Sequence, residues 1–147
     1  MELPKIQSRD EYDRKSPPGK IRINVNDCPF CNILDDKSVI IWEGERWYLV
    51  YNIFPYSGNH QHIMAIPKNH IFYGRDLSRK YWEELEDIYK VVQDFYWDNE
   101  YFSFTRESFG WRTLAHYHMH FLPWIMEWKF LRKMLEVQWF PIIEKLD

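Results

Sequence analysis

The sequence predicts one mixed domain that joins antiparallel strands to a single long α-helix. Three observations support this fold class. Short β-branched and aromatic runs separated by turn residues fill 39–66, an apolar stripe with helical spacing occupies 78–99, and alternating runs return at 101–105 and 114–122. With 147 residues, the chain is long enough to bury a core without disulfides.

The first part of the domain predicts an antiparallel meander. Residues 39–42 and 47–51 are β-branched and aromatic runs around the turn residues 43–46, which indicates a hairpin. A turn-rich loop follows, and residues 62–66 resume a strand. Pro67 ends that strand because proline cannot continue the ladder.

The second part predicts the helix and the remaining strands. Ser78 is the expected N-cap of a helix that runs to about Asn99. Its apolar residues recur at helical spacing and predict a core face: Tyr81, Leu85, Ile88, Val92 and Phe95. Pro123 closes the last predicted strand.

Three segments divide the chain. Residues 1–26 are a polar extension that we expect to be mobile or wrapped over the domain surface. Residues 27–123 form the folded domain. Residues 124–147 form a tail with a helix expected at about 127–137, and packing in the core or between subunits is its default role.

Composition excludes several function classes. The chain is 46% hydrophobic, yet it has no apolar run near the roughly 18 residues that a membrane span needs. A net charge of −3 gives no electrostatic footprint for duplex nucleic acid. The first residues lack the basic start and apolar block of a signal peptide, so we expect a cytoplasmic protein.

Alternating histidines mark the strongest candidate site. His116, His118 and His120 share one face of the predicted strand, because successive side chains of a strand point to opposite faces. Neighbouring histidines on that face are about 7 Å apart along the strand, close enough for one ligand or metal ion to contact two of them. The intervening residues are expected to face a core: Tyr117, Met119 and Phe121.

The two cysteines, Cys28 and Cys31, form a C-x-x-C pair. A redox pair of this kind normally opens a helix after a strand, and no convincing strand precedes this one. Zinc is therefore the favoured interpretation. A closed tetrahedral site needs two further ligands, which should be histidines.

The motifs together resemble the histidine triad (HIT) family. The resemblance rests on Cys28-Pro-Phe-Cys31, on a strand that ends Ile66-Pro-Lys-Asn-His70, and on His116-Tyr-His118-Met-His120-Phe-Leu-Pro123. It covers about residues 28–123. It implies an α+β fold, with a curved antiparallel sheet of about five strands, one long packed helix and pairing as a homodimer.

The resemblance also implies an activity. Members of the family cleave at the α-phosphate of a nucleoside 5′-phosphate derivative, of the phosphoramidate or dinucleoside polyphosphate type, through a nucleotidyl-histidine intermediate. The middle histidine is the nucleophile, which is His118 here. His120 and His62 resemble the residues that line the phosphate site.

A zinc site is implied as well. In zinc-bearing members the ligands correspond to Cys28, Cys31, His70 and His116. This set has no vacant position for water, so the expected role of the Zn²⁺ is structural.

The loop before the triad departs from the family pattern. Many relatives have Gly-Gln-Ser there, and this chain has Trp111-Arg112-Thr113. Thr113 keeps a hydroxyl and Arg112 adds charge, so both are candidates for binding phosphate oxygens.

Two alternatives remain open. His62 and the three triad histidines are enough ligands for a catalytic metal site, which would make the protein a metal-dependent hydrolase. The altered loop also permits a zinc-stabilised module that binds nucleotides without turning them over. Chelation distinguishes the first alternative, and binding of AMP without cleavage distinguishes the second.

Overall fold

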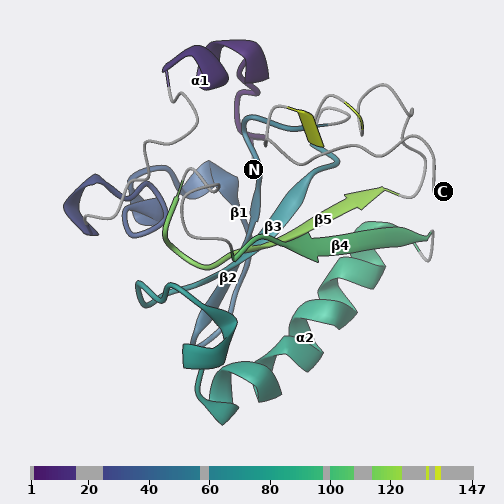
Figure 1. The fold of residues 1–147 in the computed structure, drawn as a ribbon. Coiled ribbons are helices and arrows are strands. Elements are labelled where there is room, and N and C mark those ends of the chain that lie inside the picture. The colour runs from purple at the N-terminus through teal and green to yellow at the C-terminus, as the bar shows by residue number, and fades with distance from the viewer. Residues whose placement is uncertain are drawn as a thin grey trace, which may run out of the picture.

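The computed structural model describes residues 2–15, 25–56, 60–97, 100–107 and 114–123, together with 132, 135 and 136. Its centre is a five-stranded antiparallel sheet with one long helix against it (Figure 1). This confirms the predicted α+β fold. No helix in these ranges is both long and apolar enough to cross a membrane.

The sheet has the strand order β1-β2-β3-β5-β4. The strands are β1 Ile40–Glu43, β2 Trp47–Tyr51, β3 Ile63–Pro67, β4 Tyr101–Thr105 and β5 Met119–Pro123. Since β3 pairs with β5 through Met64 and His120, the strand that begins after His62 and the strand that begins after His118 lie side by side in the sheet.

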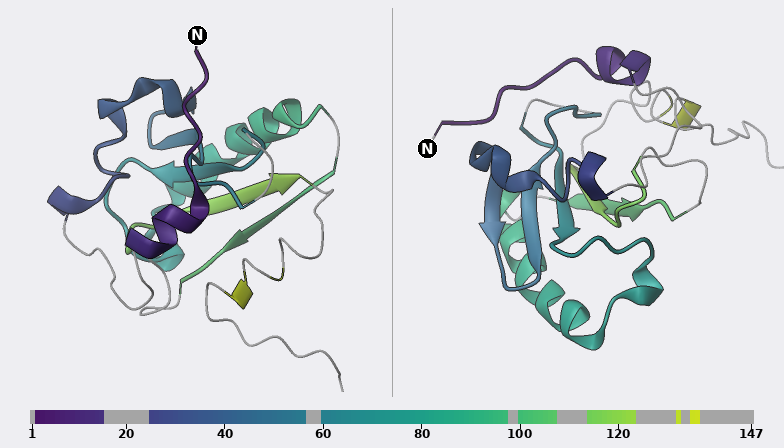
Figure 2. Two further views of the ribbon diagram at one scale, coloured as in Figure 1. Left: turned by 90° about the horizontal axis from the view of Figure 1, so that it is seen from above. Right: turned by 90° about the vertical axis from the view of Figure 1, so that its left-hand side faces the viewer.

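Helix α2, Arg79–Phe95, covers one face of the sheet (Figures 1 and 2). Ser78 occupies the predicted N-cap position, although its side chain makes no capping hydrogen bond. The helix ends four residues before the predicted Asn99. Trp97 adopts a left-handed conformation with φ of 56°, which stops the helical ladder.

Two apolar clusters lie on opposite faces of the sheet. The cluster under α2 contains the triad's intervening residues Tyr117, Met119 and Phe121, as predicted. The second cluster contains Ile33, Tyr48, Val50, Met64 and Ile66. Alternation along the strands therefore leaves the histidines on the second face.

The last strand is shorter than the predicted 114–122. Residues 115–118 leave the ladder because the Tyr117 N–H donates to the carbonyl of Ile71, at 2.6 Å, and not to a neighbouring strand. The ordered ladder starts at Met119, opposite Ala65. This departure frees His116 to turn toward another part of the chain.

Short helical segments complete the described chain. Helix α1, Arg9–Lys15, lies on the side of the sheet away from α2 (Figure 1). Four 3₁₀ turns connect other elements: η1 Val25–Asp27, η2 Ile33–Asp35, η3 Lys37–Val39 and η4 Gly74–Asp76. The tail helix expected at 127–137 falls outside the described residues apart from 132, 135 and 136.

Candidate functional site

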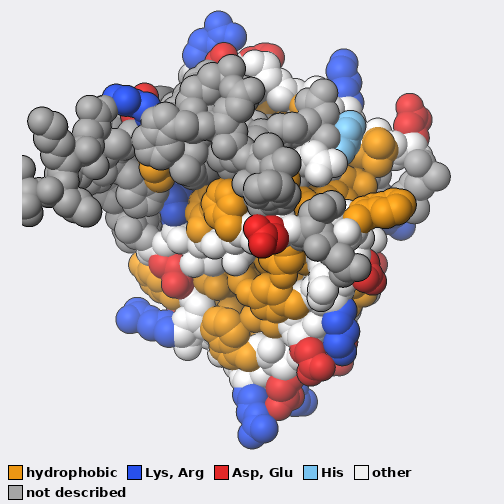
Figure 3. Space-filling model, turned by 90° about the vertical axis from the view of Figure 1, so that its right-hand side faces the viewer, with side chains coloured by type: hydrophobic (Ala, Val, Ile, Leu, Met, Phe, Trp, Pro, Cys, Tyr) orange, Lys and Arg blue, Asp and Glu red, His pale blue; other side chains and the backbone are white. Residues whose placement is uncertain are grey.

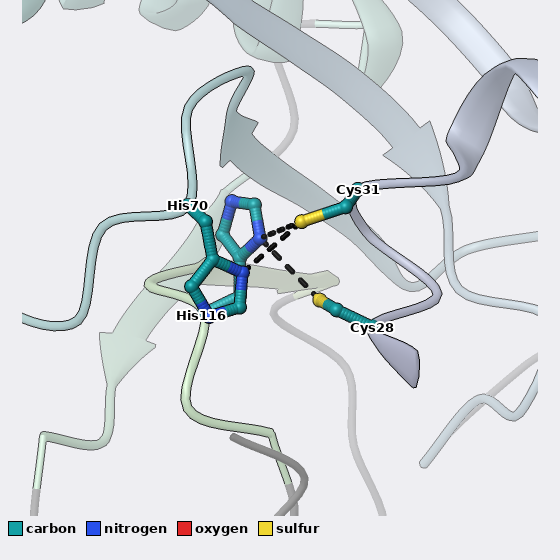
Figure 4. A group of neighbouring side chains, drawn as sticks. All are labelled: Cys28, Cys31, His70 and His116. Atoms are coloured by element: carbon teal, nitrogen blue, oxygen red, sulfur yellow. Dashed lines mark hydrogen bonds between the residues drawn. The ribbon is translucent and has the colours of Figure 1, made fainter. Parts of the chain in front are cut away.

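Four potential zinc ligands meet beside the sheet: Cys28, Cys31, His70 and His116. Their ligand atoms all lie within 4.8 Å of one another (Figure 4). The Sγ of Cys31 is 3.0 Å from Nδ1 of His70 and 3.5 Å from Nδ1 of His116. A tetrahedral Zn²⁺ with two sulfur and two nitrogen ligands places them about 3.3 to 3.8 Å apart, so the donor set fits this ion.

Separate elements bring these ligands together. Cys28 and Cys31 belong to the turn between η1 and η2, which the Cys31 N–H closes by donating to the Cys28 carbonyl at 3.1 Å. His70 follows the end of β3, and His116 precedes β5. The cluster therefore joins the chain before β1 to the two central strands.

The tautomer and the neutral state of His116 suit metal binding. The Nε2–H of His116 donates to the carbonyl of Pro67 at 2.7 Å, so Nδ1 carries the lone pair on the side of the cysteines. Burial lowers the pKa of His116 to about 4, which keeps the ring neutral at pH 7. Burial, and then the neighbouring Cys28, raise the pKa of Cys31 to about 12. A bound Zn²⁺ acts in the opposite direction and stabilises the thiolate.

His118 has a defined tautomer. Its Nδ1 lies 2.8 Å from the carbonyl oxygen of His116, and a carbonyl can only accept a hydrogen bond. In the neutral ring, the proton is therefore on Nδ1 and the lone pair is on Nε2. The Phe30 ring packs against the imidazole in a T-shaped arrangement, with 5.0 Å between the ring centres. A neutral imidazole held in this way is a competent nucleophile.

His62 and His120 form a second hydrogen-bonded pair. The Tyr56 N–H donates to Nδ1 of His62 at 3.1 Å, which places the His62 proton on Nε2. That Nε2–H donates to Nδ1 of His120 at 2.8 Å. The remaining proton of His120 is consequently on Nε2, a buried atom without a hydrogen-bond partner in the described chain.

Burial is the main reason why both rings are neutral. It holds the pKa values of His62 and His120 well below 6.5. The positive charge of Arg9 lowers both values further. A neutral His120 with its proton on Nε2 can donate a hydrogen bond to an anion that enters the pocket.

A pocket of about 220 Å³ opens beside these histidines, with His118 and His120 in its wall. Apolar side chains line one part of the wall: Phe30, Ile33, Val39, Val50 and Met64. Asp35 and Asp36 add carboxylates, and Arg9 and Arg106 add guanidinium groups. The pocket can thus contact an apolar ring, hydroxyl donors and an anion.

The predicted residues fall into three groups. His118 and His120 line the pocket, and His62 lies directly behind His120. The four predicted zinc ligands form a separate cluster. Arg112 and Thr113 lie outside the described residues. Arg9, in the polar extension, has no sequence pattern that would have predicted its place in the pocket.

Solved structures share this fold. A HIT family hydrolase from Clostridium thermocellum has 26% sequence identity and a TM-score of 0.56, and the match covers 69% of this chain and 94% of that one. A zinc-bound histidine triad family protein from Mycobacterium smegmatis matches with 19% identity, a TM-score of 0.59, and coverage of 73% and 81%. A hypothetical protein from Leishmania major has 19% identity, a TM-score of 0.62, and coverage of 71% and 78%.

Sequence comparisons add no further relatives. No family model and no curated protein matches the chain. At these low identities, the structural matches show the fold, and the presence of hydrolases among them supports an enzyme at the level of the fold.

Proposed function

We propose that this chain, whose fold is that of the histidine triad proteins, is a nucleotide hydrolase or transferase that cleaves at the α-phosphate of a nucleoside 5′-phosphate derivative. The observation that carries this proposal is the tautomer of His118. Its Nδ1–H is held by the His116 carbonyl, so Nε2 has the lone pair that nucleophilic attack requires. His118 also lines the pocket that would hold the nucleotide.

The pocket fits the three parts of a nucleotide. The side chains of Phe30 and Ile33 offer an apolar surface for a base. The carboxylates of Asp35 and Asp36 can accept hydrogen bonds from sugar hydroxyls. His120 offers a buried N–H for a phosphate oxygen.

The reaction has two displacements. Nε2 of His118 attacks the α-phosphorus, the bond to the leaving group breaks, and its electron pair departs with that group. Water then attacks the phosphorus and loses a proton, the P–Nε2 bond breaks with its electron pair returning to Nε2 of His118, and the nucleoside monophosphate is released. His120, kept in one tautomer by His62, donates its Nε2–H to the phosphate oxygens as their charge changes.

We further propose that Cys28, Cys31, His70 and His116 hold a structural Zn²⁺. Four protein ligands leave no position for a reacting water. The ring of His116 would bind the metal, while the carbonyl of the same residue orients His118. The metal site would thus fix the nucleophile through the backbone and not by touching substrate.

The catalytic-metal alternative finds little support in the geometry. In the described residues, the ring of His116 joins the cysteine cluster and is not gathered with His62, His118 and His120 into one group. The binding-module alternative differs from the enzyme only in turnover, so an activity measurement separates the two.

The test is release of AMP from adenosine 5′-phosphoramidate by the wild type and by His118→Ala, each with and without EDTA. We expect the wild type to turn over in EDTA for as long as it stays folded, and the folded variant to lose at least about 1,000-fold in kcat, because the nucleophile is missing. Acid-quenched wild type should carry a covalent nucleotidyl group by mass spectrometry. Binding of AMP without turnover would instead favour the binding module, and loss of activity in EDTA with an intact fold would favour the metal hydrolase.

A further inference from the structure

The N-terminal segment, defined here as residues 2–15, is attached to the loop that follows β2. The Gln7 N–H donates to the carbonyl of Ile53 at 2.7 Å, and Nε2 of His60 lies 2.7 Å from the Pro4 carbonyl. The rings of Tyr12 and Phe54 pack with 4.5 Å between their centres. Figure 2 shows α1 across the sheet from α2. Backbone and ring contacts thus hold this segment against the site.

Arg9, the first residue of α1, lies in the wall of the pocket that contains His118 and His120. Its guanidinium is 4.5 Å from the centre of the Tyr56 ring and 4.7 Å from that of Tyr12. The Tyr56 ring in turn stacks on His62 at 5.0 Å. These stacked rings place the positive charge of Arg9 next to the histidine end of the pocket.

A second guanidinium is present at this end. Arg106 follows β4, is buried, and lines the same pocket. The charges of Arg9 and Arg106 both act on His120 and lower its pKa, after the larger effects of burial and of the neighbouring His118 and His62. The α-phosphate of a phosphodiester or phosphoramidate carries about one negative charge, which one buried guanidinium and the N–H of His120 can match. Arg9 therefore places a second guanidinium at the histidine end of the pocket.

We propose that the N-terminal segment is part of the active site and that Arg9 is a specificity-determining residue, which binds an anionic leaving group of the substrate. The inference rests on the function proposed above. The substrate class is a nucleotide whose α-phosphorus is bonded to a further phosphate. When Nε2 of His118 bonds to the α-phosphorus, the bond to the bridging oxygen breaks and its electron pair stays on the departing phosphate. Arg9 can stabilise that growing charge, whereas a leaving amine needs a proton instead.

The experiment compares Arg9→Gln with Arg14→Gln. Arg14 lies on the same helix, is exposed and bonds to the Asp10 carbonyl, so it is a matched control for the loss of one positive charge outside the pocket. The substrates are diadenosine triphosphate, with an anionic leaving group, and adenosine 5′-phosphoramidate, with a neutral one. For Arg9→Gln we expect kcat/KM to fall about 10- to 100-fold on the first substrate and by less than about threefold on the second.

Two further results complete the expectation. Arg9→Lys should recover part of the activity on diadenosine triphosphate because it keeps the charge, and Arg14→Gln should match the wild type on both substrates. Equal losses on the two substrates would mean that Arg9 only supports the fold of the segment, and that result would overturn the proposal. An unchanged kcat/KM in Arg9→Gln would overturn it as well.

Calorimetry separates this inference from the proposed reaction. If the wild type cleaves neither substrate, the proposed function fails, and the affinities for ADP, AMP and adenosine then decide the role of Arg9. Arg9→Gln should bind ADP about tenfold more weakly than the wild type does, with a smaller loss for AMP and none for adenosine. The same ADP affinity in both proteins, or no ADP binding by the wild type, would overturn the anion site.

Discussion

Backbone groups orient three histidines of the site: His62, His116 and His118. The carbonyl of Pro67 accepts from His116, the carbonyl of His116 accepts from His118, and the N–H of Tyr56 donates to His62. A carboxylate partner would stabilise a protonated ring, whereas these partners fix a tautomer without adding a charge. In neutral rings, these partners set which nitrogen carries the lone pair, which suits both nucleophilic attack and zinc binding.

This arrangement predicts a loss of stability in acid. Burial holds the pKa values of His62 and His120 well below 6.5, so the folded chain leaves both rings neutral where the unfolded chain binds protons. Above about pH 6.5 both rings are neutral in the folded and in the unfolded chain, so they cause no loss in the free energy of unfolding. As the pH falls below that value, it should decrease by up to about 1.4 kcal/mol per histidine for each pH unit. Urea unfolding at about pH 7.5 and about pH 5.5 measures this loss.

The matched comparison is the double variant His62→Gln, His120→Gln. Any effect of acid on the zinc cluster is common to both proteins and cancels in the difference between them. The destabilisation caused by the two substitutions should shrink between about pH 7.5 and about pH 5.5. A difference that stays constant over this range would show that the two rings do not titrate on unfolding.

At the scale of elements, the cysteine turn, defined as residues 25–35, has little regular structure of its own. It contains two single-turn 3₁₀ segments, η1 and η2, and its residues Val25 and Leu34 are exposed. The contacts of Cys28 and Cys31 with His70 and His116 attach it to the ends of two central strands. A metal ion at this point would join three segments that are far apart in the sequence, so it should contribute strongly to folding.

We therefore expect Cys28→Ser to lower the free energy of unfolding by several kcal/mol, on the order of 3 to 5. Urea unfolding measures the loss of stability, and the zinc content of the purified protein shows whether the metal is bound. Chelation should bring the wild type close to the variant, while the variant itself should respond little to the chelator. The proposal of a structural Zn²⁺ would fail if the wild type is purified without zinc, or if it melts at the same temperature as Cys28→Ser.

The sequence was sufficient to predict elements whose apolar pattern is local. The periodicity of Tyr81, Leu85 and Ile88 gave the core face of α2, and alternation in β5 separated His120 from Phe121. The sequence could not predict the length of β5, because the hydrogen bond from the Tyr117 N–H to the Ile71 carbonyl joins loops that are far apart in the chain. Nor could it place Arg9, whose position depends on aromatic contacts across the fold and not on spacing along the chain.

At the scale of the whole molecule, one face of the sheet packs the core and the other face forms the candidate site. The face under α2 is filled by the larger apolar cluster, while the opposite face holds the pocket and the histidines. Phe104 of the outer strand β4 stacks on His120 with 4.6 Å between ring centres, so the edge of the sheet also supports the site. Changes at that edge can therefore reach the triad through a single ring contact.

The same edge is where we expect a second chain to bind. Strand β4 is the last in the sheet order, so one side of its backbone faces no other strand of the described chain. Figure 3 shows hydrophobic side chains gathered on this side of the molecule, and α2 contributes an exposed Tyr89 whose ring packs on Phe121. Pairing along β4 would cover both features and would form the homodimer that the resemblance to the histidine triad family implies.

Sedimentation should then give a mass of about twice 18.3 kDa. Tyr89→Asp should shift the protein toward the monomer, because a carboxylate in an apolar interface is costly. Leu34→Asp is the matched control, since Leu34 is also apolar and exposed but lies on η2, in the cysteine turn. If the wild type sediments as an 18.3 kDa monomer, β4 has no partner in solution and the site must function in a single chain. If both variants remain dimeric, the second chain binds elsewhere and the exposed Tyr89 has another role.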